Sequence, residues 1–181
     1  MSTFPLTSPP SVTWHKNPKQ THFGAPRSGG FPIHGACDLI APAGTEVLAV
    51  QEGHVVRGPY SFVTYCEGGK NETTTYAVDV AHPHFMARYG EIGHTLPAGV
   101  SAGSRVAEGQ VIAYVGAQCG GSMLHFELFD DPSRLDILTD TSAHKYLYVP
   151  QNNYHRRNDL LDPTWLLDSW YAAIPASRWM R

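Results

Sequence analysis

Apolar and polar residues alternate most clearly over residues 122–129, which read Ser-Met-Leu-His-Phe-Glu-Leu-Phe. Aromatic and aliphatic residues fill this stretch, so it predicts a β-strand near the middle of a sheet. Its two leucines and first phenylalanine would face a core, whereas Met123, His125 and Glu127 would face the opposite side. A histidine held on a rigid strand in this way is a candidate metal ligand.

Shorter stretches with β character follow one another from about residue 31 onward, and turn residues separate them. The predicted strands cover residues 47–50, 54–57, 60–66, 74–81, 87–92 and 110–115, besides the stretch already described. No amphipathic helix interrupts the set. The chain also has 17 Gly and 14 Pro, which suits a turn-rich protein. We therefore expect a mainly β domain.

The two ends of the chain have a different pattern. Residues 1–30 are rich in Pro, Ser, Thr and Lys without a sustained period, and predict an extended, partly mobile leader that lies on the domain. Near the other end, Asp162 as a cap and Pro163 in the first turn predict a helix. We assign residues 31–150 to the main domain and residues 151–181 to a C-terminal helical extension packed on it.

Length and charge limit the classes of function. A chain of 181 residues has the size of one ordinary domain. Its formal net charge of −3 gives no electrostatic reason to expect nucleic acid as a partner. No run of about 18 apolar residues could span a membrane. Residues 1–10 lack the basic start and apolar run of a signal peptide, so we expect synthesis in the cytoplasm without the general secretion route.

Three cysteines are too few for a disulfide framework. A single pair, Cys66 with Cys119, could form, but free buried thiols are the favoured interpretation. Cys37 stands one residue before Asp38, and in an extended segment its side chain would point away from that carboxylate. For Cys37 we therefore favour packing over metal ligation.

His34 and Asp38 form a second candidate constellation. They stand four positions apart around a small Gly-Ala turn, and could bring an imidazole and a carboxylate to one point. His125 would add a third ligand from an adjacent strand, and a catalytic zinc ion uses about three N or O ligands and one open position for water. The alternative for His125 is a core histidine bonded to a carbonyl.

From about residue 31 to residue 129 the chain resembles the lysostaphin-type (LytM-like) zinc endopeptidases of peptidoglycan. The matching pieces, in order, are HGACDL at 34–39, APAGTEV at 41–47, RYGEI at 88–92, the Gly-rich stretch 103–116 and LHFEL at 124–128. The resemblance implies an antiparallel β-sheet core with a groove. It also implies a zinc ion held by His34, Asp38 and His125.

Two positions depart from the pattern of this family. The family has His-x-His near the last strand and its first histidine is catalytic, whereas Met123 stands at that position here. The family also has a histidine after Tyr-Gly, and Glu91 replaces it. Met123 has no proton to transfer, so we expect it to form an apolar wall beside the metal.

Glu91 is the candidate that could restore proton transfer. Strand alternation would place Tyr89 and Glu91 on the face of the site, and a carboxylate near a zinc-activated water is a competent general base. The broader relatives of this family that act on D-Ala-D-Ala peptides use a glutamate as base. We predict an active subtype with Glu91 as base and Tyr89 as a candidate transition-state group. Glu127, two residues after His125, could either support a metal ligand or cap the groove, and both roles stay open. The alternative for Glu91 is a solvated turn residue.

The resemblance implies hydrolysis of stem-peptide or cross-bridge amide bonds in peptidoglycan. The alternative is a catalytically degenerate fold that binds peptidoglycan or a partner protein without cleaving it. A third interpretation is a cytoplasmic metallopeptidase with another substrate. A wall hydrolase made without a signal peptide would act in the periplasm or cell wall of a target bacterium. It would arrive there as a phage lysin or as an antibacterial effector injected by a type VI secretion system, and an effector would need an immunity protein.

Overall fold

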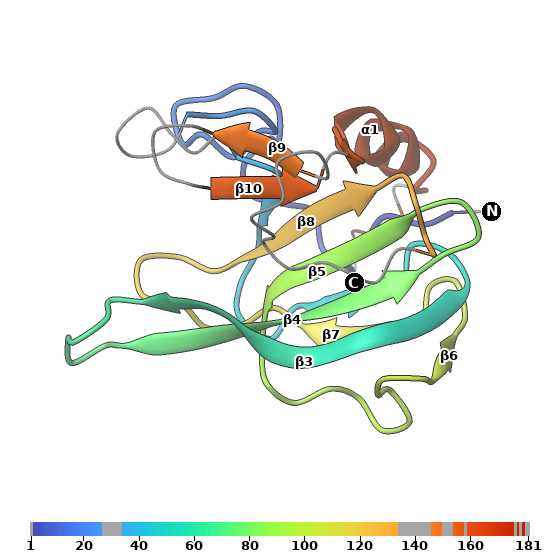
Figure 1. Ribbon diagram of the computed structural model, residues 1–181, viewed down its shortest axis with the longest axis horizontal. Coiled ribbons are helices and arrows are strands. Elements are labelled where there is room, and N and C mark those ends of the chain that lie inside the picture. Colours follow the sequence, from blue (N-terminus) through green and yellow to red (C-terminus); the bar gives the residue numbers. More distant parts are fainter. Residues whose placement is uncertain are drawn as a thin grey trace.

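The computed structural model describes residues 2–26, 34–133, 146–149, 154–157 and 159–175, together with 177 and 179. A curled antiparallel sheet dominates the described residues (Figure 1). Its strands, in spatial order, are β1 (Cys37–Ile40), β8 (Met123–Phe129), β5 (Met86–Ile92), β4 (Thr73–Ala81), β3 (Gly53–Tyr65) and β6 (Arg105–Val106). A seventh strand, β11 (Leu160–Leu161), pairs with the end of β8. The prediction of a mainly β, antiparallel fold is confirmed.

Smaller elements accompany this sheet. They are the pair β2 (Glu46–Leu48) and β7 (Val111–Tyr114), the pair β9 (Tyr146–Val149) and β10 (Tyr154–Arg157), and the helix α1 (Thr164–Ala172). The predicted C-terminal helix is therefore present. It has nine residues, and no helix in the described part of the chain is both long and apolar enough to cross a membrane.

The stretch from residue 54 to residue 66 differs from the prediction. Instead of two strands separated by a Gly-Pro turn, the structure has the single long strand β3. The pairing with β4 shifts its register between Arg57 and Tyr60, so the Gly58–Pro59 pair is absorbed as an irregularity within the ladder. Gly58 has a φ of +122°, which a residue with a side chain rarely adopts, and Pro is tolerated in a strand at such a bulge.

The two faces of the large sheet have different roles. On one face, Phe126 from β8 and Tyr89 from β5 belong to a single hydrophobic core, together with Ile112 from β7 and Leu167 from α1. The opposite face carries the polar residues of β8 and its neighbours. This separation follows from strand alternation, because successive side chains point to opposite faces.

The N-terminal segment contributes to the same core. Phe4 and Leu6 are fully buried and Trp14 is nearly so. The indole nitrogen of Trp14 donates to Asp168 of α1 at 3.0 Å, which links this segment to the helix. Of the tryptophans of α1, Trp170 is buried whereas Trp165 is 66% exposed. Residues 2–26 and α1 are thus packed on the body of the molecule rather than separate from it.

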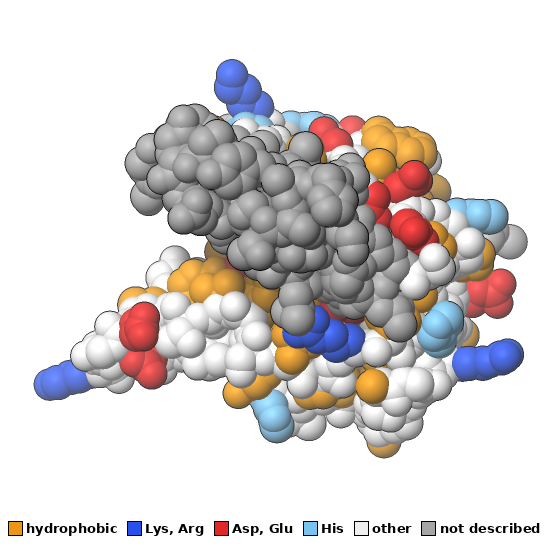
Figure 2. All heavy atoms as spheres, in the orientation of Figure 1, with side chains coloured by type: hydrophobic (Ala, Val, Ile, Leu, Met, Phe, Trp, Pro, Cys, Tyr) orange, Lys and Arg blue, Asp and Glu red, His pale blue; other side chains and the backbone are white. Residues whose placement is uncertain are grey.

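β3 and β4 continue beyond the end of β5 as a two-stranded hairpin. Pairing between β4 and β5 begins at Tyr76, so the outer part of the hairpin pairs only with itself within the described residues. Figure 2 shows the hairpin projecting from the body of the molecule, with charged side chains near its tip. Two strands alone are marginally stable in water, so this projection needs other contacts to hold it in place.

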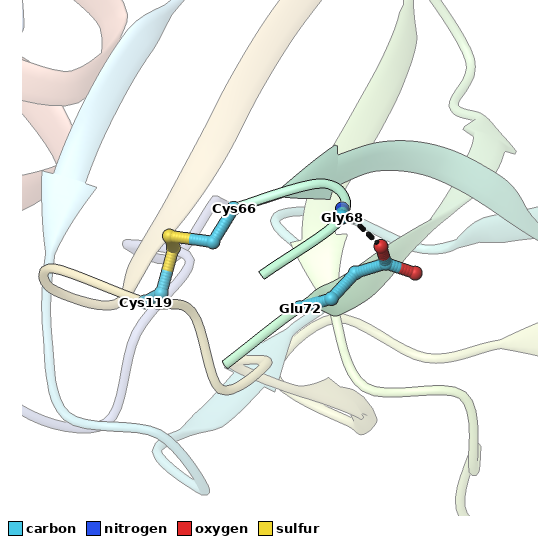
Figure 3. Close-up of a disulfide and its surroundings, with 4 residues drawn as sticks. All are labelled: Cys66, Gly68, Glu72 and Cys119. Carbon is cyan, nitrogen blue, oxygen red and sulfur yellow. Dashed lines mark hydrogen bonds between the residues drawn. A yellow bond between two sulfur atoms is a disulfide. The ribbon is translucent and has the colours of Figure 1, made fainter. Parts of the chain in front are cut away.

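A disulfide supplies one such contact. Cys66, at the base of the hairpin loop, is bonded to Cys119 in the segment before β8, with their Cα atoms 6.4 Å apart (Figure 3). Within the loop, the Gly68 backbone N–H donates to the Glu72 carboxylate at 2.7 Å. The expectation of three free thiols is therefore wrong for this pair, because the fold brings together two segments that the sequence keeps 53 residues apart. Cys37 is free and buried.

Candidate metal centre

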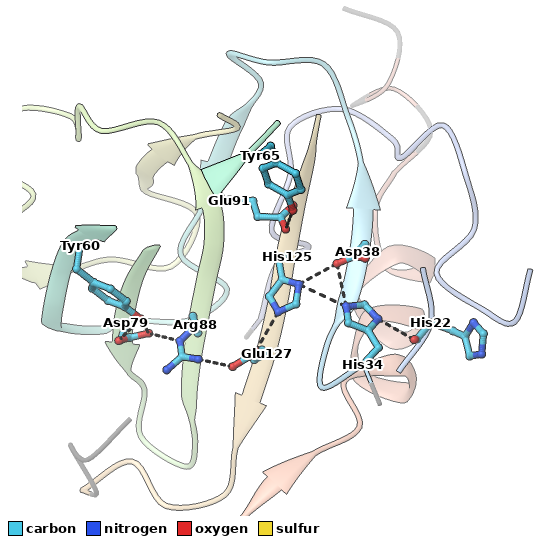
Figure 4. A network of polar contacts seen from close by, with 10 residues as sticks. All are labelled: His22, His34, Asp38, Tyr60, Tyr65, Asp79, Arg88, Glu91, His125 and Glu127. Carbon is cyan, nitrogen blue, oxygen red and sulfur yellow. Dashed lines mark hydrogen bonds and ion pairs between the residues drawn. The ribbon is translucent and has the colours of Figure 1, made fainter. Parts of the chain in front are cut away.

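His34, Asp38 and His125 converge on one point on the polar face of the sheet (Figure 4). Asp38 lies on β1 and faces His125 of β8 directly across the antiparallel ladder, while His34 precedes β1 by one short turn. All three side chains are buried. Sheet register therefore sets the position of two of the three residues, and a local turn sets the third.

The distances within this trio fit a tetrahedral metal ion. The Asp38 Oδ1 atom lies 2.9 Å from His125 Nδ1 and 3.1 Å from His34 Nε2. The two ring nitrogens are 3.4 Å apart. Zinc bonds of about 2.0–2.1 Å at tetrahedral angles would place neighbouring ligand atoms about 3.3–3.4 Å apart. To match these values, the two distances from Asp38 Oδ1 to the ring nitrogens would need to lengthen by only a few tenths of an ångström.

Neighbouring groups direct the ring nitrogens toward this centre. His34 Nδ1 donates to the backbone oxygen of His22 at 2.9 Å, which leaves the electron pair of Nε2 pointing at the trio. His125 Nε2 donates to Glu127 Oε1 at 2.9 Å, which does the same for Nδ1 in the neutral ring. Three electron-rich atoms aimed at one point repel one another unless a cation lies between them. The donor set therefore fits a zinc ion.

The charges of the trio depend strongly on one another. Burial alone would raise the pKa of Asp38, but its hydrogen bonds with His125 and His34 outweigh burial and hold the pKa well below its ordinary value. Burial would likewise lower the pKa of His125, but hydrogen bonds to Asp38 and Glu127 raise it to about 9. Without a metal, a proton on His125 balances the two carboxylates. A bound metal ion would replace that proton.

A chain of buried polar residues lies behind His125. Arg88 on β5 donates to Glu127 Oε2 at 2.7 Å and to Asp79 Oδ1 at 3.1 Å. The Tyr60 hydroxyl donates to the Asp79 carboxylate at 2.8 Å. Burial would lower the pKa of Arg88, but the adjacent Glu127 and Asp79 raise it above its ordinary value. These contacts, visible in Figure 4, fix Glu127 and through it the orientation of the His125 ring.

Glu91 reaches the polar face through a β-bulge. In the pairing of β5 with β4, Tyr76 lies opposite Ile92 and Ala77 lies opposite Gly90, which leaves Glu91 as the extra residue. Its φ of +62° is in the left-handed region, which is uncommon for a residue with a side chain. Such backbone strain is often found at functional sites.

Two donors hold the Glu91 carboxylate beside His125 (Figure 4). The Tyr65 hydroxyl donates to Oε1, and Gln118 Nε2 donates to Oε2 at 2.8 Å. The side chain is nearly inaccessible, so Glu91 is not the solvated turn residue of the alternative interpretation. Burial raises the pKa of Glu91, and the charge on His125 and the two hydrogen bonds oppose that rise.

Tyr89 does not lie at the site. Its fully buried side chain points into the core, where the hydroxyl accepts a hydrogen bond from the Val50 backbone N–H at 3.0 Å and lies 3.1 Å from His82 Nε2. The prediction of Tyr89 as a transition-state group is wrong. Regular alternation assumed that Tyr89 and Glu91 share a face, but Glu91 is itself the extra residue of the bulge, and its side chain therefore turns to the opposite face from Tyr89.

Met123 lies two residues before His125 on β8, on the same face, and is partly exposed. An aromatic wall that the sequence did not indicate is also present. The Phe62 ring is centred 5.3 Å from the His125 ring. Gly90 makes room for it, because a Cβ atom there would come within 2.8 Å of the Phe62 ring. The Phe62 ring therefore covers His125 from the hairpin side, while the role of Met123 as an apolar wall stays a prediction.

No sequence pattern indicated Tyr65 or Gln118 as part of the site. Tyr65 directly precedes Cys66 and Gln118 directly precedes Cys119. Without knowledge of the disulfide, these positions do not show that the two side chains meet at Glu91. Arg88 and Asp79 were missed as well. A charged residue at an inward position of an otherwise apolar strand is the signal that could have indicated them.

The sequence model of peptidase family M23 matches residues 32–137 of the chain. No curated protein matches it. Among solved structures, cbpa from L. salivarius REN is 20% identical, with 96% of this chain and 99% of that chain covered and a TM-score of 0.53. LytU is 22% identical, with 81% of each chain covered and a TM-score of 0.51. The antimicrobial peptidase lysostaphin from Staphylococcus simulans is 18% identical, with 83% of this chain and 51% of that chain covered and a TM-score of 0.51. These similarities confirm the lysostaphin-type fold.

Proposed function

The chain belongs to peptidase family M23, and we propose that it is a zinc-dependent endopeptidase of peptidoglycan. It would hydrolyse amide bonds of stem peptides or cross-bridges. The observation that carries this proposal is the convergence of His34, Asp38 and His125, whose donor atoms all lie within 4.8 Å of one another. Family membership supports the reaction class, and the donor set supports zinc as the cofactor.

His34, Asp38 and His125 would hold the metal. When bound there, a zinc ion would polarise the scissile carbonyl and make a water molecule more acidic. The chain orients both imidazoles for this purpose, because the His22 backbone oxygen and the Glu127 carboxylate accept the protons of the outward ring nitrogens. A bound metal ion would take the place of the second proton on His125. The bulk of Phe62 limits the access of other water to His125 from the hairpin side.

Glu91 would accept a proton from the attacking water and deliver it to the leaving amine. Each oxygen of its carboxylate accepts one hydrogen bond, from Tyr65 or Gln118, and retains a further electron pair for a water molecule. Burial raises the pKa of Glu91, which makes its carboxylate a stronger base toward water. Met123 can neither accept nor donate a proton, so Glu91 would carry out both proton transfers.

The test is digestion of purified peptidoglycan, read by mass spectrometry of the released peptides. Zinc-loaded wild type should create new amino termini, and metal-stripped protein should not. Glu91→Gln should retain zinc but lose cleavage. The matched control is Glu67→Gln, which removes an exposed carboxylate of the hairpin loop and should cleave normally. Inert wild type with one zinc ion bound per chain would overturn the proposal.

A second candidate function is binding without cleavage. It is favoured by one specific observation, that Met123 and Glu91 occupy the two positions where the family resemblance implies catalytic histidines. In that case zinc-loaded protein would sediment with peptidoglycan and release nothing. The same digestion, with the pellet analysed for bound protein, separates the two candidates.

Action in the periplasm or cell wall of a target bacterium is supported by the Cys66–Cys119 disulfide, because such bonds persist in oxidising compartments. Delivery by a type VI secretion system, release as a phage lysin and neutralisation by an immunity protein stay predictions. The substrate groove stays a prediction as well.

A further inference from the structure

The two side chains that hold Glu91 come from distant parts of the chain. Tyr65 is the last residue of β3, at the outer end of the hairpin, and Gln118 lies in the segment between β7 and β8. In both segments the next residue is a half-cystine, and Cys66 and Cys119 are bonded to each other. The disulfide thus joins the two segments directly beside the two donors.

Within the described residues, no strand pairing joins the outer hairpin to the rest of the sheet. β4 leaves its partner β5 at Tyr76, so Tyr65 and its cross-strand neighbour Thr73 lie on a two-stranded ribbon. Such a ribbon is marginally stable alone. Without the covalent link, the end of β3 could move away from the body of the molecule, and the Tyr65 hydroxyl would move with it.

We propose that Tyr65 and Gln118 are positioning residues for Glu91, and that the Cys66–Cys119 disulfide holds them in place so that peptidase activity requires this bond. This inference rests on the proposed function, in which Glu91 is the general base. The geometry supports it on both carboxylate oxygens, since Tyr65 occupies Oε1 and Gln118 occupies Oε2. A carboxylate held at both oxygens cannot rotate away from the metal centre.

The physical reason lies in the length of the glutamate side chain. Glu91 has three rotatable bonds, and its backbone sits on a bulge rather than in a regular ladder. A misplacement of about 1 Å can reduce a catalytic rate about 10²-fold. The donors therefore affect the rate of the chemical step more than they affect substrate binding.

The redox step is an ordinary thiol–disulfide exchange. The thiols of Cys66 and Cys119 reduce one molecule of a low-molecular-weight disulfide; the protein gains its S–S bond, and the small molecule leaves as two thiols that carry the two protons. In a compartment rich in small thiols the reverse exchange opens the bond. Peptidase activity would then be high in an oxidising compartment and low in a reducing one.

Kinetics on a defined cross-linked muropeptide provide the first test. Reduction by a phosphine, which adds no thiol ligand for zinc, should lower kcat about tenfold or more and leave KM within about twofold. The Cys66→Ser/Cys119→Ser variant should match the reduced wild type and respond no further to the phosphine. Tyr65→Phe should lower kcat about tenfold. Thr64→Val, which removes the adjacent hairpin hydroxyl bonded to Thr74, is the control and should not.

Cobalt substitution provides a readout that does not depend on turnover. The visible absorption bands of Co²⁺ in place of zinc respond to groups beside the metal. Reduction should shift these bands in wild type and in Thr64→Val, but not in Glu91→Gln, where the clamped carboxylate is absent. Equal shifts in wild type and Glu91→Gln, or none in either, would overturn the inference.

The two proposals fail in different ways. If oxidised wild type cleaves, Glu91→Gln does not, and reduction changes neither kcat nor the cobalt spectrum, the proposed function stands and the positioning role is overturned. If no oxidised sample cleaves, the proposed function fails. The cobalt spectra then decide alone whether the disulfide positions Glu91 at the metal.

Discussion

The two halves of the candidate site are built by different means. Two of the three candidate ligands of the metal-binding half lie on regular strands, where Asp38 faces His125 across the β1–β8 ladder and Arg88 supports Glu127. His34 lies just before β1. The proton-transfer half depends on irregular features: Glu91 sits on a bulge, and loop residues joined by a disulfide hold its carboxylate. Folding of the sheet is enough to set the positions of the residues in the first half. The second half can be altered while the sheet stays intact.

The largest expected effect comes from removing a ligand. His125→Ala deletes a donor atom and leaves Asp38 and Glu127 as buried carboxylates without this partner. We expect the variant to lose zinc on dialysis and its cleavage to fall to background. Zinc content per chain and peptide release, measured on the same sample, check this. A variant that keeps one tightly bound zinc ion would show that the metal lies elsewhere.

Breaking the buried charges behind the ligands should affect folding more than chemistry. Arg88→Leu leaves Asp79 and Glu127 buried without their cation, which we expect to reduce the free energy of unfolding by about 3–5 kcal/mol. Urea denaturation of the metal-free protein measures it. Arg105→Leu, at an exposed position of β6, is the control and should change stability by less than about 0.5 kcal/mol. Equal losses would mean that the buried network does not stabilise the sheet.

His82, a buried histidine away from the metal centre, should make the stability of the sheet depend on pH. Burial lowers the pKa of His82 from 6.5 to about 4. Between these values the unfolded chain binds a proton that the folded chain does not. The free energy of unfolding is therefore unaffected by this proton above the unfolded pKa. As the pH falls toward 4, it decreases by about 3 kcal/mol in total because of His82.

Urea denaturation between pH 7 and pH 4 tests this effect. Over that range His82→Gln should lose less stability than the wild type, because its side chain binds no proton. Parallel curves for the two proteins would contradict the assignment.

The smallest expected effect lies in the second half of the site. A Cβ atom at Gly116 would come within 2.8 Å of the Ile92 backbone oxygen and 2.9 Å of the Glu91 backbone oxygen. Gly116→Ala must therefore displace the bulge, and we expect it to cost about 1–3 kcal/mol of stability and to lower kcat while zinc is retained. A Cβ atom at nearby Gly93 would lie an ordinary 3.8 Å from its nearest contact, the Tyr114 backbone oxygen. Gly93→Ala is the matched control. An equal fall in kcat in both variants would show that displacement of the bulge is not the cause.

The same division explains what the sequence could predict. Local alternation identified β8, and the short spacing between His34 and Asp38 indicated two further candidate ligands, because these features depend on near neighbours in the chain. The error at Tyr89 came from a bulge that no local pattern reveals. The Cys66–Cys119 pairing is a contact over 53 residues, which sequence reasoning judged less favourable than free thiols.

We propose that Glu91 acts as the base of a zinc peptidase, and one rate comparison tests this role most directly. The measurement is kcat on a defined cross-linked muropeptide for wild type and Glu91→Gln, each with one zinc ion bound per chain. We predict a fall of about 10²–10⁴-fold in the variant, the usual contribution of general acid–base catalysis. Equal rates for the two proteins, or no turnover by either, would contradict the claim.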